Sequence, residues 1–197
     1  MTAHDDAFAA CKFVKSTCGV QSINRLDDVE TSETRHVRQM MFTHFNKFAT
    51  GEGVSKLSPL PGTPPSDQMT QVAAWAKSLM TFPVGTCDAM ACLALVYLAE
   101  KKTSFPVSQM SLVDADHVFV VVGTGIARNG PWSQWDTANA AICDPWADYV
   151  GPCTRTGVQT WMEKLGQICE APFAPAATMS TMFEIASRAD WKYKLIP

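Results

Sequence analysis

The 197-residue chain has few charged residues, few histidines and no long apolar run, and each scarcity excludes a class of protein. Charged residues make up 18% of the chain and hydrophobic residues 47%, whereas an ordinary soluble domain has about 25% charged residues. Intrinsic disorder is therefore excluded for most of the chain. The formal net charge is −3, and no basic run is longer than Lys101-Lys102. The sequence therefore predicts no binding of nucleic acid or of an anionic membrane.

No apolar run reaches the length that crosses a bilayer. The longest, Ala89 to Ala99, is about half of the roughly 20 residues required, and it predicts a buried core helix instead. The first residues, Met-Thr-Ala-His-Asp-Asp, are acidic and precede no hydrophobic stretch, so we expect no Sec-type signal peptide. We expect a soluble protein, and export into a target cell would need a signal-peptide-independent route.

The scarcity of metal-binding patterns excludes a structural zinc site. The chain has only four histidines and no Cys-x-x-Cys pair, so no tetrahedral ligand spacing emerges. Seven cysteines, an odd number in a long chain, disfavour a disulfide framework and indicate free thiols and a reducing folding compartment. We expect neither a metal nor a cofactor. The cysteines are Cys11, Cys18, Cys87, Cys92, Cys143, Cys153 and Cys169.

The composition divides the chain into three parts. Residues 1–50 carry apolar residues at helical spacing over 7–18 and 33–49, which predicts a helical N-terminal part that could form a cap. Residues 51–67 are rich in proline and glycine and predict a connection without regular structure. Residues 68–197 then form the core domain.

Within residues 68–197 the apolar period changes from helical to alternating. Helices are predicted over 68–81 and about 86–101, and the second is apolar nearly all round, so other elements should surround it. Short segments rich in Val and Ile predict strands of one sheet, and helices are expected again towards the C-terminus. The strands are expected over 107–113, 117–123 and 138–144, and the helices over 158–168 and near 180–189.

The long connection between 123 and 138 contains two tryptophans. Its Gly, Asn and Pro content indicates a surface loop. Exposed side chains of Trp132 and Trp135 would suit a protein partner, whereas folded-back ones would form a small satellite core.

Cys87 is the candidate nucleophile. It follows Val84-Gly85-Thr86 in the first turn of the buried helix, where orphan backbone N–H groups and the positive end of the helix dipole favour thiolate over thiol. The alternative is a packing role, because free cysteine is among the most buried residue types. The remaining cysteines have no such placement, and packing roles are expected for them.

His117 and Asp144 are the candidate base and orienting carboxylate. His117 begins one predicted strand and Asp144 ends another. In a hairpin with arms of equal length, Gly123 would pair with Ala138 and His117 with Asp144, and directly opposed side chains project to the same side within hydrogen-bonding reach. A cysteine, a histidine and a carboxylate so arranged form the set that acyl transfer needs.

Three segments together resemble a known family. They are Gly85-Thr-Cys87 at the start of an apolar helix, His117-Val-Phe-Val-Val-Val-Gly123, and Ile142-Cys-Asp144-Pro-Trp146. They resemble the Cys-His-Asp core of the papain-like toxins and effectors of bacteria, and the chain order and the Asp-Pro pair are also similar to the wider transglutaminase-like superfamily. The resemblance covers about residues 83 to 150, less than half of the chain.

The resemblance implies a fold and a set of roles. The fold is an α+β papain-like core, in which a central helix bearing the nucleophile packs on an antiparallel sheet beside an N-terminal helical part. Cys87 is implied to be the nucleophile, His117 the general base and acid, and Asp144 the orienting carboxylate. Members are implied to be glutamine deamidases or cysteine proteases, often delivered into other cells to modify a host protein.

The expected function is therefore a cysteine-dependent amide hydrolase of the effector or toxin type. It would deamidate a glutamine side chain of a target protein through a thioester, without a cofactor. A cysteine protease, a peptidoglycan amidase and a non-catalytic protein-binding module are the alternatives. A reactive Cys87 would separate the enzymes from the binding module.

Two details of the expected site stay open in the sequence. Papain proper has a glutamine six residues before its cysteine, where this chain has Thr81, so only the backbone N–H of Cys87 is assigned to the oxyanion hole. Gln71 and Gln134 are candidates for the second donor. Trp146 either shields the bond between His117 and Asp144 from water or is a core aromatic.

Overall fold

The computed structural model describes residues 2–22, 25, 40, 43, 65–115, 117–169, 177–187 and 190–197. The fold is α+β, as the sequence predicts. The helices are α1 (Ala3–Lys12), α3 (Pro65–Thr81), α4 (Cys87–Tyr97) and α5 (Arg155–Cys169), with the shorter turns η1 (Phe13–Thr17), η3 (Leu98–Lys102), η4 (Val113–Ala115) and η5 (Trp132–Gln134). The strands are β1 (Gln21–Ser22), β2 (Val84–Gly85), β3 (Val107–Leu112), β4 (His117–Gly123), β5 (Asn129–Pro131), β6 (Ala140–Asp144), β7 (Tyr149–Pro152) and β8 (Thr178–Ile185).

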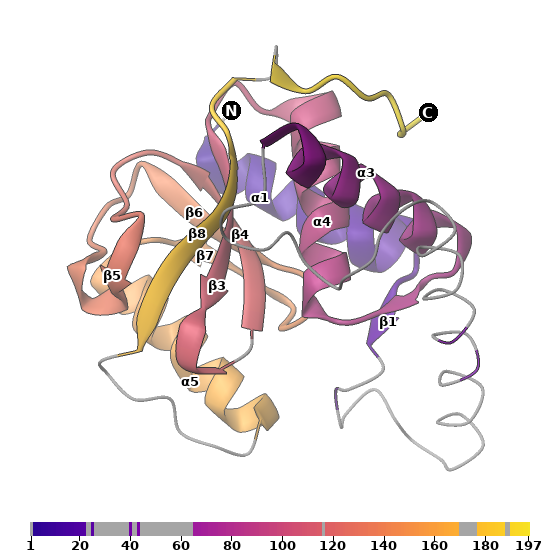
Figure 1. Ribbon diagram of the computed structural model, residues 1–197. Coiled ribbons are helices and arrows are strands. Elements are labelled where there is room, and N and C mark those ends of the chain that lie inside the picture. The colour runs from indigo at the N-terminus through magenta and orange to yellow at the C-terminus, as the bar shows by residue number, and fades with distance from the viewer. Residues whose placement is uncertain are drawn as a thin grey trace.

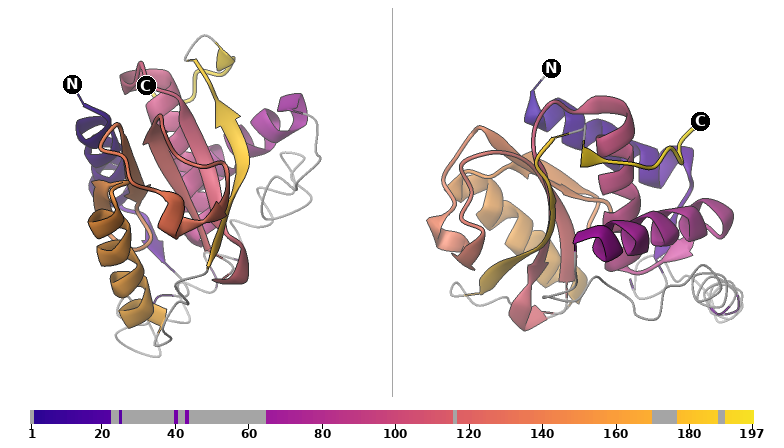
Figure 2. Two further views of the ribbon diagram at one scale, coloured as in Figure 1. Left: turned by 90° about the vertical axis from the view of Figure 1, so that its left-hand side faces the viewer. Right: turned by 45° about the horizontal axis from the view of Figure 1, so that its top comes forward.

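The main sheet has six strands in the order β5-β8-β3-β4-β6-β7, and every neighbouring pair is antiparallel. Side chains alternate between the two faces along a strand, and two residues identify what covers each face. Phe119 packs on Trp161 of α5 with ring centroids 4.4 Å apart, whereas Cys143 lies against Cys11 of α1. The sheet is curved, with α5 on one side of it and α1 and α4 on the other (Figures 1 and 2).

The central helix α4 confirms the prediction of a wrapped core helix. Every residue from Ala89 to Val96 is buried, because α3 crosses its outer side while α1 and strands β3 and β4 lie against the others (Figure 1). Burial of so many apolar side chains stabilises the fold by roughly 1.5–3 kcal/mol for each large one. The helix is therefore a fixed support for its own first residue, Cys87.

Helix α1 belongs to the same hydrophobic core as the rest of the described chain. A capping box starts it, in which Thr2 and Asp5 bond each other's backbone N–H groups, and Ala7, Ala10 and Val14 are fully buried. The predicted helix over 33–49 lies outside the described residues apart from 40 and 43. The boundaries at 50 and 67 stay a prediction, with one detail added: α3 already begins at Pro65, because proline suits the first turn of a helix.

The predicted helix near 180–189 is wrong, because residues 178–185 form strand β8. The segment fits both periods: Met179, Met182 and Phe183 have helical spacing, whereas Met179, Thr181, Phe183 and Ile185 alternate. The strand forms because β3 on one side and β5 on the other both pair with it. These partners satisfy its backbone groups on both edges.

The two tryptophans of the long connection fold back rather than face a partner. Trp135 is fully buried, its ring lies 6.3 Å from that of Phe119, and its indole N–H donates to the carbonyl of Ala127 over 3.1 Å. Trp132 is half-buried against the same core. Among the described helices, none combines the length and the apolar character that a membrane span requires.

Candidate active site

Cys87 is the first residue of α4. Pro83 and the short strand β2 end the preceding helix, and Thr86 is extended, with φ −93° and ψ 177°, so the new helix starts at the cysteine. The Thr86 side chain makes no capping hydrogen bond to the first turn. The cysteine is 7% exposed and lies at the positive end of the α4 dipole, where a negative charge is stabilised.

His117 opens strand β4 and is joined to Asp144 by a hydrogen bond of 2.7 Å between Nε2 and Oδ2. Both residues are buried, His117 at 5% and Asp144 at 0% exposure. The imidazole is surrounded by the rings of Trp146, Trp161 and Phe119, with centroids 5.1, 6.1 and 6.2 Å away. The predicted pairing of His117 with Asp144 is therefore present, in a buried site lined by aromatic rings.

The pairing arises from a register that differs from the predicted one. Gly123 pairs with Ala140, not Ala138, and Val120 pairs with Cys143. The predicted register is thus wrong by two residues, because β6 begins only at Ala140. Gly123 has φ 115°, and a Cβ there would lie 2.1 Å from the carbonyl oxygen of Asn139, so this glycine permits the tight approach that sets the register.

A shift of two residues leaves the site intact. Side chains repeat every second residue along a strand, so only an odd shift would move Asp144 to the other face. With the observed register Asp144 lies one step beyond the pair Val120–Cys143, next to the position of Phe119. His117 is then its diagonal neighbour on the same face, a distance that two side chains can bridge.

Asp144 accepts hydrogen bonds from three donors. Oδ2 accepts from His117 and from the indole Nε1–H of Trp161 at 2.8 Å, and Oδ1 accepts from the backbone N–H of Ala147 at 3.0 Å. Burial alone would raise the pKa of this carboxyl, but the charge and hydrogen bond of His117, with the Trp161 and Ala147 donors, hold it below its ordinary value. The carboxylate is therefore ionised.

The same pair sets the charge of His117. Burial alone would lower its pKa, but the charge of Asp144 and its hydrogen bond raise the pKa well above the ordinary value, and the Cys87 side chain adds to this by a hydrogen bond and by its charge. Since Asp144 engages Nε2, the ring nitrogen available to Cys87 is Nδ1. The structure thus brings together all three residues that the sequence singled out.

The other buried cysteines have the properties of packing residues. Burial raises the pKa of Cys11 and of Cys153 to about 12, with the charge of Asp148 adding at Cys11, and it also raises the pKa of Cys92 and Cys143. A thiol of such high pKa is not a nucleophile near neutral pH. None of the seven cysteines, all of which lie in the described part of the chain, forms a disulfide.

Trp161 is the residue of the site that sequence reasoning missed. The spacing of Val158, Trp161, Met162 and Leu165 marks them as the buried face of α5. That pattern indicates burial, but it contains no sign that the indole bonds a carboxylate on β6. Trp146, for which the sequence left a shielding and a core role open, is buried and lies against His117, and its indole N–H donates to the Ser22 hydroxyl over 2.8 Å.

The two candidates for the second oxyanion donor lie in different parts of the fold. Gln134 is exposed and lies against Gly130 at edge strand β5. Gln71 is next to Thr70, whose hydroxyl bonds Tyr193 of the C-terminal segment over 2.9 Å. That segment is attached to Glu100, beyond the far end of α4.

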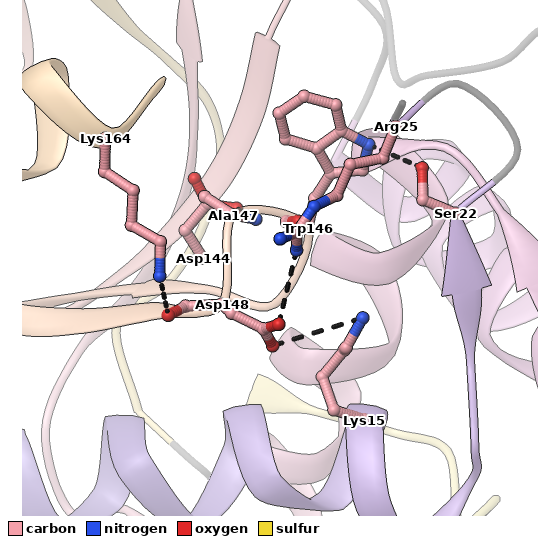
Figure 3. A network of polar contacts seen from close by, with 8 residues as sticks. All are labelled: Lys15, Ser22, Arg25, Asp144, Trp146, Ala147, Asp148 and Lys164. Carbon is pink, nitrogen blue, oxygen red and sulfur yellow. Dashed lines mark hydrogen bonds and ion pairs between the residues drawn. The ribbon is translucent and has the colours of Figure 1, made fainter. Parts of the chain in front are cut away.

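The turn after Asp144 is held by the N-terminal part of the chain. Figure 3 shows Asp148 between Lys15 and Arg25, while Lys164 donates to the Asp148 carbonyl over 2.7 Å. Arg25 also donates to the carbonyl of Trp146 over 2.9 Å. The turn that supplies the Ala147 N–H to Asp144 is thereby fixed from outside the sheet.

Comparison of the chain with protein-family models, with curated proteins and with solved structures finds no match. Within the ranges that the structure describes, no cluster of three His, Cys, Asp or Glu side chains could hold a metal ion.

Replacing Trp161 by Phe tests how far the indole supports the site. The change keeps an aromatic ring but removes one of three donors to Asp144, so the pKa of Asp144 should rise. We expect a loss of about 1–2 kcal/mol in unfolding free energy and roughly a fivefold slower reaction, measured by chemical denaturation and by alkylation of Cys87.

Trp135→Phe is the matched control. Trp135 is equally buried and donates one hydrogen bond, but to a backbone carbonyl away from Asp144. It should lose similar stability with no change in Cys87 reactivity. Equal effects of both substitutions on reactivity would mean that Trp161 acts only through packing.

Proposed function

We propose that this protein is a cysteine-dependent amide hydrolase that deamidates a glutamine side chain of a target protein. The observation that supports the proposal most strongly is a cysteine at a helix N-terminus whose side chain helps to raise the pKa of a buried histidine, which is itself hydrogen-bonded to a buried carboxylate that accepts three hydrogen bonds. This is the nucleophile, base and orienter arrangement of acyl transfer. The resemblance of the three sequence segments to papain-like bacterial effectors favours a protein as the substrate.

The first half of the reaction forms a thioester. His117 Nδ1 takes the thiol proton of Cys87, and the α4 dipole and the imidazolium stabilise the resulting thiolate. The sulfur attacks the amide carbon, and the oxygen that becomes negative accepts a hydrogen bond from the backbone N–H of Cys87. His117 then gives its proton to the leaving nitrogen, and ammonia departs.

The second half restores the enzyme. A water molecule gives a proton to His117 as it attacks the thioester carbon, and the cysteine leaves as thiolate and regains a proton. The net reaction converts an amide and water into a carboxylic acid and ammonia. Throughout, Asp144 holds Nε2–H and keeps Nδ1 directed at the sulfur, while the aromatic rings around His117 exclude competing water.

A thiol protease would use the same three residues, since both reactions pass through a thioester. The preference for a side-chain amide comes from the resemblance to single-domain effectors.

Mass analysis of candidate target proteins separates these reactions. Each target is incubated with wild-type protein and with the Cys87→Ala variant, and its peptides are then mapped. We expect conversion of one glutamine to glutamate, with release of ammonia, by the wild type only. Two fragments separated at a backbone bond would instead identify a protease, and an unaltered target together with an unreactive Cys87 thiol would identify a binding module.

A further inference from the structure

We propose that Ser22 and Arg25 are positioning residues that join the two halves of the site, the segment ending at Cys87 and the turn following Asp144. The inference rests on the proposed function. Both residues contact Trp146, and Arg25 also contacts Asp148. They fix where the sulfur and the imidazole lie relative to each other.

The first connection runs from the N-terminal part to Cys87. The backbone N–H of Gln21 donates to the carbonyl of Pro83 over 3.0 Å, and Ser22 pairs with Gly85 in the parallel ladder of β1 and β2. Only Thr86 separates this ladder from the cysteine. Gly85 is itself closely packed, because a Cβ there would lie 2.9 Å from Leu79. The start of α4 is therefore fixed against β1.

The second connection runs from the same residues to the histidine side. The Ser22 hydroxyl, fully buried, accepts the indole N–H of Trp146 over 2.8 Å. The Trp146 ring in turn lies against His117, with centroids 5.1 Å apart. The backbone of Ser22 thus pairs with β2, the strand just before Cys87. Its side chain bonds Trp146, whose ring lies against His117.

Arg25 fixes the turn that Trp146 belongs to. Arg25 is 8% exposed, and its guanidinium bridges the Trp146 carbonyl at 2.9 Å and Asp148 Oδ2 at 3.2 Å. Figure 3 shows the contact with Asp148. Asp148 has φ 52°, a conformation that costs energy in a non-glycine residue and persists when neighbours impose it. This turn also supplies the Ala147 N–H to Asp144.

Without Arg25 the turn would relax, Trp146 would move from His117, and the contact between Cys87 and His117 would loosen. A cysteine that depends on the imidazole for its thiolate would then react more slowly at low pH, where an isolated thiol is protonated. Above the ordinary thiol pKa of about 8.5 the thiolate forms without help. Loss of positioning is therefore measured by the ratio of alkylation rates at about pH 6 and about pH 9.5.

The test is alkylation of Cys87 by iodoacetamide in the full chain, quantified on the Cys87 peptide by mass spectrometry. In Arg25→Met, which keeps the length of the side chain but removes its donors and charge, we expect the rate at pH 6 to fall about tenfold and the rate at pH 9.5 to change less than twofold. Arg25→Lys should recover part of the loss. Ser22→Ala should show a smaller loss of the same kind.

Lys15→Met is the matched control, because Lys15 contacts the same Asp148 carboxylate at 4.0 Å without bonding the Trp146 carbonyl. Because this contact is long and half-exposed, it holds the turn weakly, and Lys15→Met should change both rates less than about twofold. Asp148 is half-exposed, so Arg25→Met leaves no buried unpaired charge. If near-UV circular dichroism nevertheless shows that Arg25→Met is unfolded, the ratio of rates in Ser22→Ala tests the inference. An unchanged ratio of rates in a folded variant overturns the inference, whereas a wild-type Cys87 that is unreactive at pH 6 overturns the proposed function itself.

Discussion

The Cys87→Ala variant should lose at least about 10⁴-fold in amide hydrolysis while staying folded. The loss follows because no other group can form the thioester, and removal of a nucleophile costs about as much as removal of the whole catalytic set. The cost in stability is small, since only one sulfur atom at the edge of the core is removed. We expect about 1 kcal/mol, or a fall of roughly 2–4 °C in melting temperature for a domain of this size.

Cys92→Ala is the control for this result. Cys92 lies five residues further along the same helix, is fully buried and receives a weak hydrogen bond from Gln109. Its removal should destabilise the protein at least as much as that of Cys87, with full activity retained. Activity that survives in folded Cys87→Ala, measured as ammonia release from the target, would contradict the proposed hydrolase.

Asp144→Asn should slow the reaction by roughly 10- to 10³-fold, the usual scale for a positioned acid–base group. The effect is smaller than that of Cys87→Ala, because a thiol ionises more readily than a serine hydroxyl and depends less on the third residue. A neutral amide no longer favours the charged imidazole, so the pKa of His117 should fall. Titration of the His117 ring by NMR, assigned by its absence in His117→Gln, measures this shift.

The structure adds a stability cost to the same substitution. All three partners of Asp144 are donors, so the amide NH₂ of an asparagine must face one of them. We expect a loss of about 1–3 kcal/mol for the buried group left unsatisfied. Asp136→Asn is the control, since Asp136 is exposed and accepts the backbone N–H of Arg155 at the start of α5, a role that asparagine fills equally well.

The stability difference between wild type and Asp144→Asn should depend on pH. The raised pKa of His117 contributes stability that is fully present below its ordinary pKa of about 6.5 and is lost as the pH rises through the raised value. The lowered pKa of Asp144 contributes stability that is fully present above about pH 4 and is lost as the pH falls through the lowered value. The difference in melting temperature should therefore be largest between about pH 4 and pH 6.5. A difference independent of pH would show that the pair is not ionised.

The candidate site was predicted from the sequence because each member depends on local signals. Pro83 to Gly85 interrupts a helical pattern and places Cys87 at the start of the next helix, and the alternation after His117 marks a strand. Even the wrong register placed Asp144 correctly, because its error was an even number of residues. A two-residue error keeps His117 and Asp144 on the same face of the sheet, although it assigns the wrong cross-strand partner to each residue.

Local signals in the sequence predict the buried helix α4, the strand β4 and the position of Cys87, because periodicity and helix-starting residues act within a few residues of each other. The strand at Thr178–Ile185, the bond from Trp161 to Asp144 and the contacts of Ser22 and Arg25 with Trp146 arise only from tertiary packing. These contacts join residues up to 124 positions apart. A local pattern specifies which side chains are buried, but which donor meets which acceptor depends on the packing of whole elements against one another.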